Sequence, residues 1–189
     1  MLNLPNFLTL IRILSIPFFL VYLSYHRYLE ALIIFIIGGI TDFLDGLAAR
    51  LMKQQTPLGA YLDPIADKLL VAAALISLVQ LDMVSAWMAA VIVGRELAVT
   101  GLRGVALSMG VVMAPSKLGK WKTVTQYVAI TLLILEKGVP EEYVPFYMVA
   151  AAALWLALAV TVASGVDYFY GFLVRAGSGA LVKDRERWP

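Results

Sequence analysis

Long apolar runs constrain the fold of this chain more than any other feature of its sequence. Of the 189 residues, 61% are hydrophobic, whereas ordinary soluble domains are about 45–50% apolar. A helix of about 20 apolar residues crosses a bilayer and satisfies its own backbone hydrogen bonds. We therefore predict an all-α, polytopic membrane protein with six transmembrane helices. Their expected positions are 7–25, 28–52, 58–80, 84–109, 121–135 and 143–174.

The charges of the connecting loops predict how the helices are oriented. Six spans place both termini on one side, together with the loops at 53–57 and 110–120, which contain lysines, and the basic tail. The opposite side receives the acidic loop at 136–142. Because cytoplasmic loops carry an excess of Lys and Arg, we expect both termini in the cytoplasm and the protein in the cell (inner or plasma) membrane. Arg12, near the start of the first run, is expected to snorkel to the interface.

The chain shows no internal division. No repeat, low-complexity tract or linker is present, which predicts one domain over 1–189 with a peripheral tail after about residue 175. The first apolar run lacks a small-residue cleavage site, so we expect no cleavable signal peptide. The sequence contains no cysteine, which excludes disulfides, thiolate nucleophiles and zinc–thiolate sites.

Four aspartates interrupt the second and third apolar runs. Asp42 and Asp45 are three residues apart, so they share one face of a helix. Asp63 and Asp67 are four apart and share a face of the next helix. The two runs are joined by a short polar turn. An antiparallel helical hairpin would therefore bring the four carboxylates together near its closed end, on the predicted cytoplasmic side.

Such a cluster is costly unless something neutralises it. One charged carboxylate at the centre of a membrane helix costs roughly 2.5–3.5 kcal/mol, and four would cost on the order of 10 kcal/mol, comparable to the stability of a whole domain. Oxygen ligands favour Mg²⁺, Mn²⁺ or Ca²⁺ over zinc or copper. We interpret the cluster as a divalent-cation site. The alternative is a set of helix-end aspartates that face water or pair with Arg50 and Lys68.

Small residues accompany the aspartates. Gly46 and Ala49 follow the first pair, and Gly59 precedes the second pair by one turn. They leave both helix faces almost bare, which favours the close approach of a bulky ligand to the backbone. Arg50 adds a fixed positive charge whose geometry matches phosphate. The pattern therefore indicates a phosphate-bearing ligand next to the metal.

Further cations lie in the fourth and fifth runs. Arg95 and Arg103 are eight residues apart on neighbouring helix faces, and Glu96 is expected to point away from Arg95. Lys120 and Lys122 begin the fifth run on the same side. Snorkelling is the alternative interpretation for the lysines and for Arg103, and a buried pair with an aspartate is the alternative for Arg95. The functional interpretation is a cationic pocket for a small anionic substrate.

The stretch from 42 to 67 resembles the signature of the CDP-alcohol phosphotransferase family, D-x2-D-G-x2-A-R-x8-G-x3-D-x3-D. All of its fixed positions are present, namely Asp42, Asp45, Gly46, Ala49, Arg50, Gly59, Asp63 and Asp67. Within that family the chain looks like the branch that makes phosphatidylglycerophosphate. The stretches at 3–6, 94–103, 118–126 and 164–168 carry this narrower likeness. Tyr168, within the last stretch, is otherwise expected to be a belt or packing residue.

The resemblance implies six transmembrane helices, a homodimer and a site that faces the cytoplasm. It implies transfer of the phosphatidyl group from CDP-diacylglycerol to sn-glycerol 3-phosphate with release of CMP, assisted by two Mg²⁺ or Mn²⁺ ions. Carried over by position, Asp42, Asp45, Asp63 and Asp67 would bind metal, and Asp67 would also be the general base. Asp42, Gly46, Ala49, Arg50 and Gly59 would bind CDP-diacylglycerol, whereas Arg95, Arg103 and Lys120 would bind the phosphate of glycerol 3-phosphate.

The chemistry of these residues agrees with a direct displacement. Two ions about 4 Å apart suit an in-line displacement at phosphorus, and a carboxylate that takes the proton of the attacking hydroxyl contributes about 10²–10⁴-fold. The signature offers no Ser, Cys or His nucleophile. We therefore expect no covalent intermediate.

Other readings remain open at this point. Sister enzymes of the family make cardiolipin, phosphatidylinositol phosphate or phosphatidylserine on the same scaffold. A divalent-cation transporter would also cluster carboxylates in a membrane, but nearer the midplane and without Gly46, Ala49 and Arg50 beside them. A purely structural membrane subunit is disfavoured because the buried charges would bring only cost.

Overall fold

The computed structural model describes residues 4–52, 57–109, 113, 116–139 and 146–177. Their side chains are described over 7–41, 64–109, 113, 116, 118–139 and 147–174. Every predicted apolar run is a helix, and no strand occurs in the described residues, which confirms the all-α class. The helices are α1 (Leu4–Ser24), α2 (Tyr28–Met52), α3 (Pro57–Gln80), α4 (Ala86–Ser108), α5 (Lys117–Gly138) and α6 (Phe146–Gly177).

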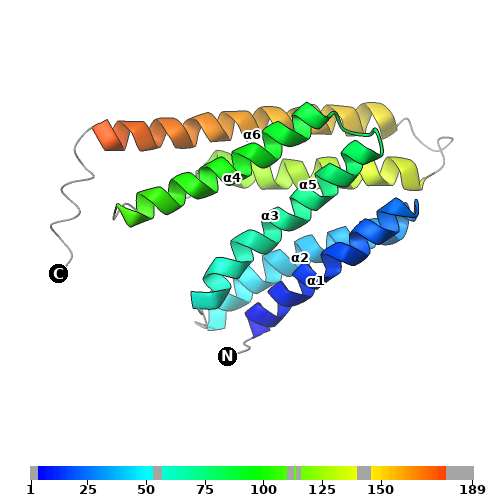
Figure 1. Cartoon of the computed structure of the whole chain (residues 1–189), viewed down its shortest axis with the longest axis horizontal. Coiled ribbons are helices and arrows are strands. Elements are labelled where there is room, and N and C mark those ends of the chain that lie inside the picture. Colours follow the sequence, from blue (N-terminus) through cyan, green and yellow to red (C-terminus); the bar gives the residue numbers. More distant parts are fainter. Residues whose placement is uncertain (1–3, 53–56, 110–112, 114–115, 140–145, 178–189) are drawn as a thin grey trace.

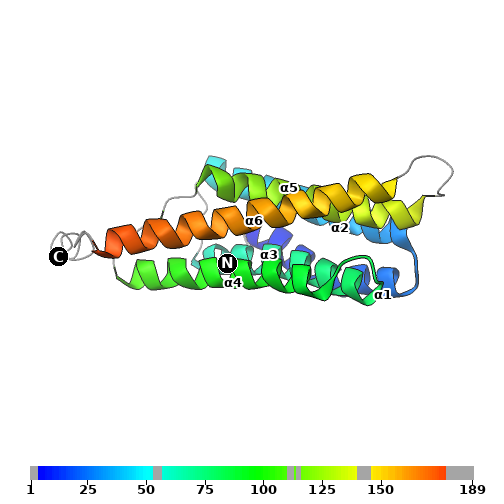
Figure 2. The same cartoon turned by 90° about the horizontal axis from the view of Figure 1, so that it is seen from above.

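The six helices alternate in direction. The starts of α1, α3 and α5 and the ends of α2, α4 and α6 lie at the same end of the molecule, on the left of Figure 1. Helix α1 packs on α2 and α3, whereas α6 packs on α4 and α5. The group α1–α3 is joined to the group α4–α6 by contacts of α2 with α5 and of α3 with α4. Figure 2 shows these helices from above. The closed end of the aspartate hairpin therefore lies at the left-hand end.

The apolar core fills the opposite half of the molecule. Its members come from the halves of the helices that lie away from the aspartate hairpin. Fully buried examples are Phe19, Phe35, Leu70, Leu75, Leu78, Ile92, Ile130, Ile134 and Ala157. The buried polar residues of α4, α5 and α6 lie from the middle of each helix toward the hairpin end. Each of these helices thus divides into an apolar half that holds the bundle together and a polar half.

The outer surface of the bundle is apolar. Leu14, Phe18, Ile76 and Leu97 are among many large hydrophobic side chains that are more than half exposed. Within the described residues, two helices are long and apolar enough to cross a membrane, over Phe7–Ser24 and Tyr147–Val174, and α2 has a shorter apolar stretch over Tyr28–Thr41. An apolar outside around buried charges is the pattern expected of a protein in lipid.

Two expectations about local structure are wrong. Arg12 does not snorkel, because its side chain is 1% exposed and its Nε donates a hydrogen bond to the carbonyl oxygen of Gly38, 3.1 Å away. Helix α5 begins at Lys117 and not near residue 121. Ser116 caps this helix, since its hydroxyl oxygen accepts a hydrogen bond from the backbone N–H of Gly119 at 3.0 Å.

Candidate functional site

The signature residues lie on α2 and α3, the two helices of the predicted hairpin. Asp42, Asp45, Gly46, Ala49 and Arg50 are within α2, and Gly59, Asp63 and Asp67 are within α3. Except for Asp67, their side chains lie outside the described part of the chain. The part with described side chains contains no group of three His, Cys, Asp or Glu that could hold a metal ion. The four-aspartate metal site therefore stays a prediction.

Asp67 has a partner that the sequence did not indicate. The hydroxyl group of Tyr127, on α5, donates a hydrogen bond to Oδ1 of Asp67 over 3.2 Å. The Tyr127 ring stacks on Phe35 with 5.1 Å between centroids. A Cβ atom at Gly39 would come within 2.6 Å of the ring, so the glycine makes room for it. The tyrosine is thus fixed on two sides and holds one carboxylate oxygen of Asp67.

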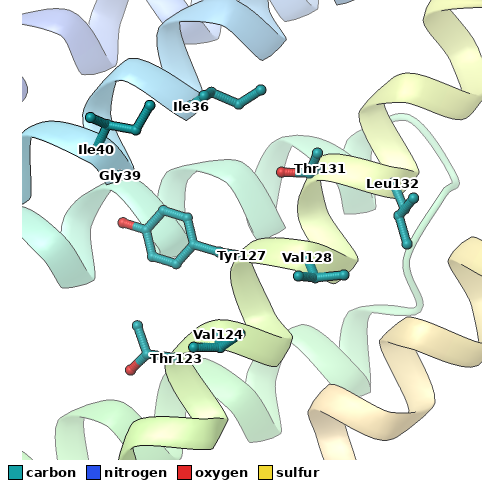
Figure 3. A pocket seen from close by; sticks show the side chains of 9 residues that line it. All are labelled: Ile36, Gly39, Ile40, Thr123, Val124, Tyr127, Val128, Thr131 and Leu132. Carbon is teal, nitrogen blue, oxygen red and sulfur yellow. The ribbon is translucent and has the colours of Figure 1, made fainter. Parts of the chain in front are cut away.

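A cavity of about 570 Å³ lies beside Tyr127, between α2 and α5. Figure 3 shows the Tyr127 side chain projecting from α5 toward Gly39 and Ile40 of α2. The other lining residues are mostly aliphatic, apart from Thr123 and Thr131. The cavity therefore presents an apolar wall close to the carboxylate that Tyr127 holds.

A buried polar network joins α4, α5 and α6. Glu96 does not point away from Arg95 as expected, because its Oε1 lies 3.2 Å from a terminal nitrogen of Arg95. Lys122 does not snorkel to the interface, because it is only 6% exposed and its Nζ lies 2.5 Å from the same Oε1 of Glu96. Gln126 contributes Nε2, at 3.5 Å from Glu96 Oε1 and 3.0 Å from Thr161 Oγ1. Helix α5 therefore brings a lysine and an amide into the network.

Tyr168 organises the two arginines. The guanidinium carbons of Arg103 and Arg95 lie 4.7 Å and 5.7 Å from the centre of its ring, within the range of cation–π attraction. Arg103 donates a hydrogen bond to the Tyr168 hydroxyl oxygen, which also accepts one from the backbone N–H of Ser116 at 3.0 Å. Arg95 donates to Ser164 Oγ at 2.6 Å. Tyr168 is thus more than the belt or packing residue that its sequence position suggested.

The structure brings together two of the three cations predicted to bind phosphate. Arg95 and Arg103 meet over one aromatic ring, although they are eight residues apart. Lys120 is exposed on α5 and forms no ion pair with a described residue, so its role stays a prediction. With Lys122 and Glu96 included, the cluster carries a formal charge of +2. Arg103 is exposed, Arg95 is partly buried and Lys122 is buried. Cations in excess of carboxylates favour an anionic ligand.

The cation cluster and the hairpin both contact α5. Lys122 pairs with Glu96, and Tyr127, five residues further along the same helix, donates a hydrogen bond to Asp67. Helix α5 therefore contributes side chains to both the cation cluster and the partner of Asp67.

Comparison with known proteins places the chain among related sequences. The model of the CDP-alcohol phosphatidyltransferase family matches residues 2–163. The chain belongs to this family. The match extends from α1 into α6, so it includes the hairpin, Arg95, Arg103 and the start of the polar half of α6.

Individual members of the family are similar over most of their length. A Bacillus subtilis protein named CDP-diacylglycerol–glycerol-3-phosphate 3-phosphatidyltransferase is 46% identical, covering 89% of this chain and 94% of the relative. A Pseudomonas fluorescens protein of the same name is 38% identical, with 88% of each chain covered. A Mycobacterium tuberculosis protein named probable phosphatidylglycerophosphate synthase is 42% identical, covering 88% of this chain and 79% of the relative.

Sequence reasoning missed several residues of the site. Tyr127 and Thr161 lie inside long apolar runs, where single polar groups give no spacing signal. Ser164 was part of the family likeness, but the sequence did not show its contact with Arg95. For Lys122, at the start of its run, the sequence left both snorkelling and a place in the cationic pocket open. The one signal available was the pairing of a buried acid with several nearby cations, since an intramembrane carboxylate needs a partner. That argument predicts a partner for Glu96 without saying which residue it is.

Proposed function

We propose that this chain transfers the phosphatidyl group of CDP-diacylglycerol to sn-glycerol 3-phosphate, giving phosphatidylglycerophosphate and CMP. The observation that carries the proposal is the pair of arginines over Tyr168, both on α4, which packs on α3 of the signature hairpin. An acceptor without a phosphate group, such as serine, has no use for a second cationic site. The relatives whose names state both substrates support the same conclusion.

The donor set of the hairpin fits divalent metal ions. Four carboxylates without nitrogen or sulfur ligands suit Mg²⁺ or Mn²⁺. We infer that Asp42, Asp45, Asp63 and Asp67 hold two such ions. When bound, the ions would neutralise the diphosphate and the charge that develops on the CMP leaving group. Gly46, Ala49, Gly59 and Arg50 would receive the CDP part of the donor.

The chain's own residues then account for the transfer. Arg95 and Arg103 bind the phosphate of the acceptor and orient its free hydroxyl group toward Asp67. Asp67, held by Tyr127, takes the proton of that hydroxyl group as a general base. The hydroxyl oxygen forms a bond to the phosphorus that carries diacylglycerol, and the anhydride bond to CMP breaks. Lys120, at the exposed start of α5, is proposed to complete the phosphate site.

We further infer that all six helices span the membrane, with both termini and the site in the cytoplasm, and that the protein is a homodimer. The apolar outer surface and the alternating helix directions support the six spans. The lysines near the left-hand end of the bundle support the orientation. In this arrangement, a water-soluble acceptor and a lipid donor both reach the closed end of the hairpin.

Release of CMP by the purified protein tests the proposal. We would supply CDP-diacylglycerol and Mg²⁺ with glycerol 3-phosphate, inositol 1-phosphate, serine or phosphatidylglycerol, and use Asp67→Asn as the control. We expect release with glycerol 3-phosphate alone, and its loss in the variant. Release with a different acceptor would keep the donor site but refute the assigned roles of Arg95, Arg103 and Lys120. Absence of release with every acceptor would refute the proposed activity and favour a cation transporter.

A further inference from the structure

One carboxylate oxygen contacts two cations inside the bundle. Oε1 of Glu96 lies 2.5 Å from Nζ of Lys122, 3.2 Å from a terminal nitrogen of Arg95 and 3.5 Å from Nε2 of Gln126. Glu96 itself is 7% exposed. Three donors from two helices thus converge on a single acceptor atom inside the bundle.

A negative charge at this position needs an explanation. By Coulomb attraction alone, a carboxylate beside an anion-binding pocket weakens the pocket. An apolar side chain would also avoid the desolvation cost of a buried ion pair. Without Glu96, however, Arg95 and Lys122 would be two like charges in a low-dielectric space and would move apart. The carboxylate therefore makes it possible to keep both cations close together before any substrate is bound.

Arg95 is held on its other sides as well. Ser164 Oγ accepts a hydrogen bond from its second terminal nitrogen, and the ring of Tyr168 lies beside the guanidinium group. A Cβ atom at Gly165 would come within 3.1 Å of Arg95 Cγ, so the backbone of α6 also closes on the side chain. Glu96 supplies the only charged contact to Arg95 among the described residues.

We propose that Glu96 is a positioning residue for the acceptor phosphate. It fixes Arg95 for the phosphate and holds Lys122 beside it, so that the pocket is assembled in advance. The inference rests on the proposed function, because it assumes that Arg95 contacts the acceptor. Prior assembly lowers the free-energy cost of binding, since fewer side chains must be ordered when the ligand arrives.

Glu96→Gln in the full-length protein tests the inference. Glutamine keeps the shape and one acceptor oxygen but removes the charge. We expect the KM and the Kd for glycerol 3-phosphate to rise about tenfold, the effect of losing a charge-assisted hydrogen bond. The KM for CDP-diacylglycerol should be unchanged, and kcat should fall less than KM rises. Titration calorimetry with glycerol 3-phosphate gives the Kd independently of activity.

Two further variants keep the test decisive. Glu30→Gln is the matched control, because Glu30 also pairs with an arginine, Arg27, but is exposed at the far end of α2. We expect it to leave both KM values unchanged. If Glu96→Gln unfolds, the double variant Glu96→Gln, Lys122→Met removes the unpaired buried charge and should fold. Its KM for glycerol 3-phosphate should still be raised, because Arg95 has lost its charged anchor.

Contrary outcomes are distinct from failure of the proposed function. An unchanged or lowered KM for glycerol 3-phosphate in Glu96→Gln would overturn the inference while the wild-type protein stays active. Equal losses for both substrates, or loss of folded protein in both variants, would also overturn it, because Glu96 would then support the bundle as a whole. A wild-type protein that releases no CMP with glycerol 3-phosphate would instead refute the proposed function.

Discussion

At the scale of single residues, the hydroxyl group of Tyr127 makes the clearest prediction. Tyr127→Phe keeps the ring stacked on Phe35 but removes the hydrogen bond to Asp67. We expect kcat to fall about tenfold, because hydrogen bonds to charged groups contribute about 1.5–3 kcal/mol and orient the base. Tyr28→Phe is the matched control, since it removes a hydroxyl group that bonds only to exposed His26 among the described residues. An unchanged kcat in Tyr127→Phe would show that Asp67 is oriented by other groups.

Single residues also show which features of the site the sequence predicts and which it does not. The spacing of the signature placed its aspartates on α2 and α3, and the positions of Arg95 and Arg103 predicted a cationic site, because both inferences depend on helix geometry. Glu96 was misjudged because adjacent helix residues point in different directions. A long arginine side chain bends across that angle when a neighbouring helix supplies contacts, here Ser164 and Tyr168. Such contacts come from the packing of α6, which no local pattern contains.

At the scale of elements, the start of α5 links helix formation to the site. Ser116 accepts a hydrogen bond from Gly119 N–H and donates its own N–H to Tyr168. Ser116→Ala removes the cap and should lower the free energy of unfolding by about 1 kcal/mol. Thermal unfolding in detergent measures the change. Ser24→Ala is the control, because that hydroxyl group only donates to a carbonyl of its own helix. Equal melting temperatures for the two variants would mean that the cap contributes nothing.

Helix boundaries were predictable where charge and hydropathy change together. The expected run at 28–52 coincides with α2, and the run at 58–80 differs from α3 by one residue. The start of α5 was missed because Lys117 and Lys120 make its first turn look like a loop. Ser116 caps the helix by accepting a hydrogen bond from the N–H of Gly119, three residues later. Serine is too common in sequences, however, for one serine to identify a helix start on its own.

At the scale of the whole molecule, the bundle has an apolar half and a half that carries the site. The core at one end supplies stability through packing, so the polar end can hold charges that packing alone would not favour. The four aspartates belong to this polar end by helix direction. In the proposed metal site, their repulsion would raise the free energy of the folded state whenever no cation is present. Metal binding and the stability of the whole bundle should therefore be coupled.

Divalent ions are accordingly expected to stabilise the folded protein. At a Mg²⁺ concentration of about 100 Kd, the free energy of unfolding should rise by about 2.7 kcal/mol, and EDTA should reverse the rise. Asp45→Asn removes one ligand and should reduce the stabilisation, as measured by thermal unfolding with and without Mg²⁺. Asp82→Asn is the matched control, because Asp82 lies in the loop between α3 and α4, at the other end, with a φ of 57° that asparagine tolerates. Equal stabilisation of both variants by Mg²⁺ would place the metal elsewhere and remove the physical reason for the aspartate hairpin.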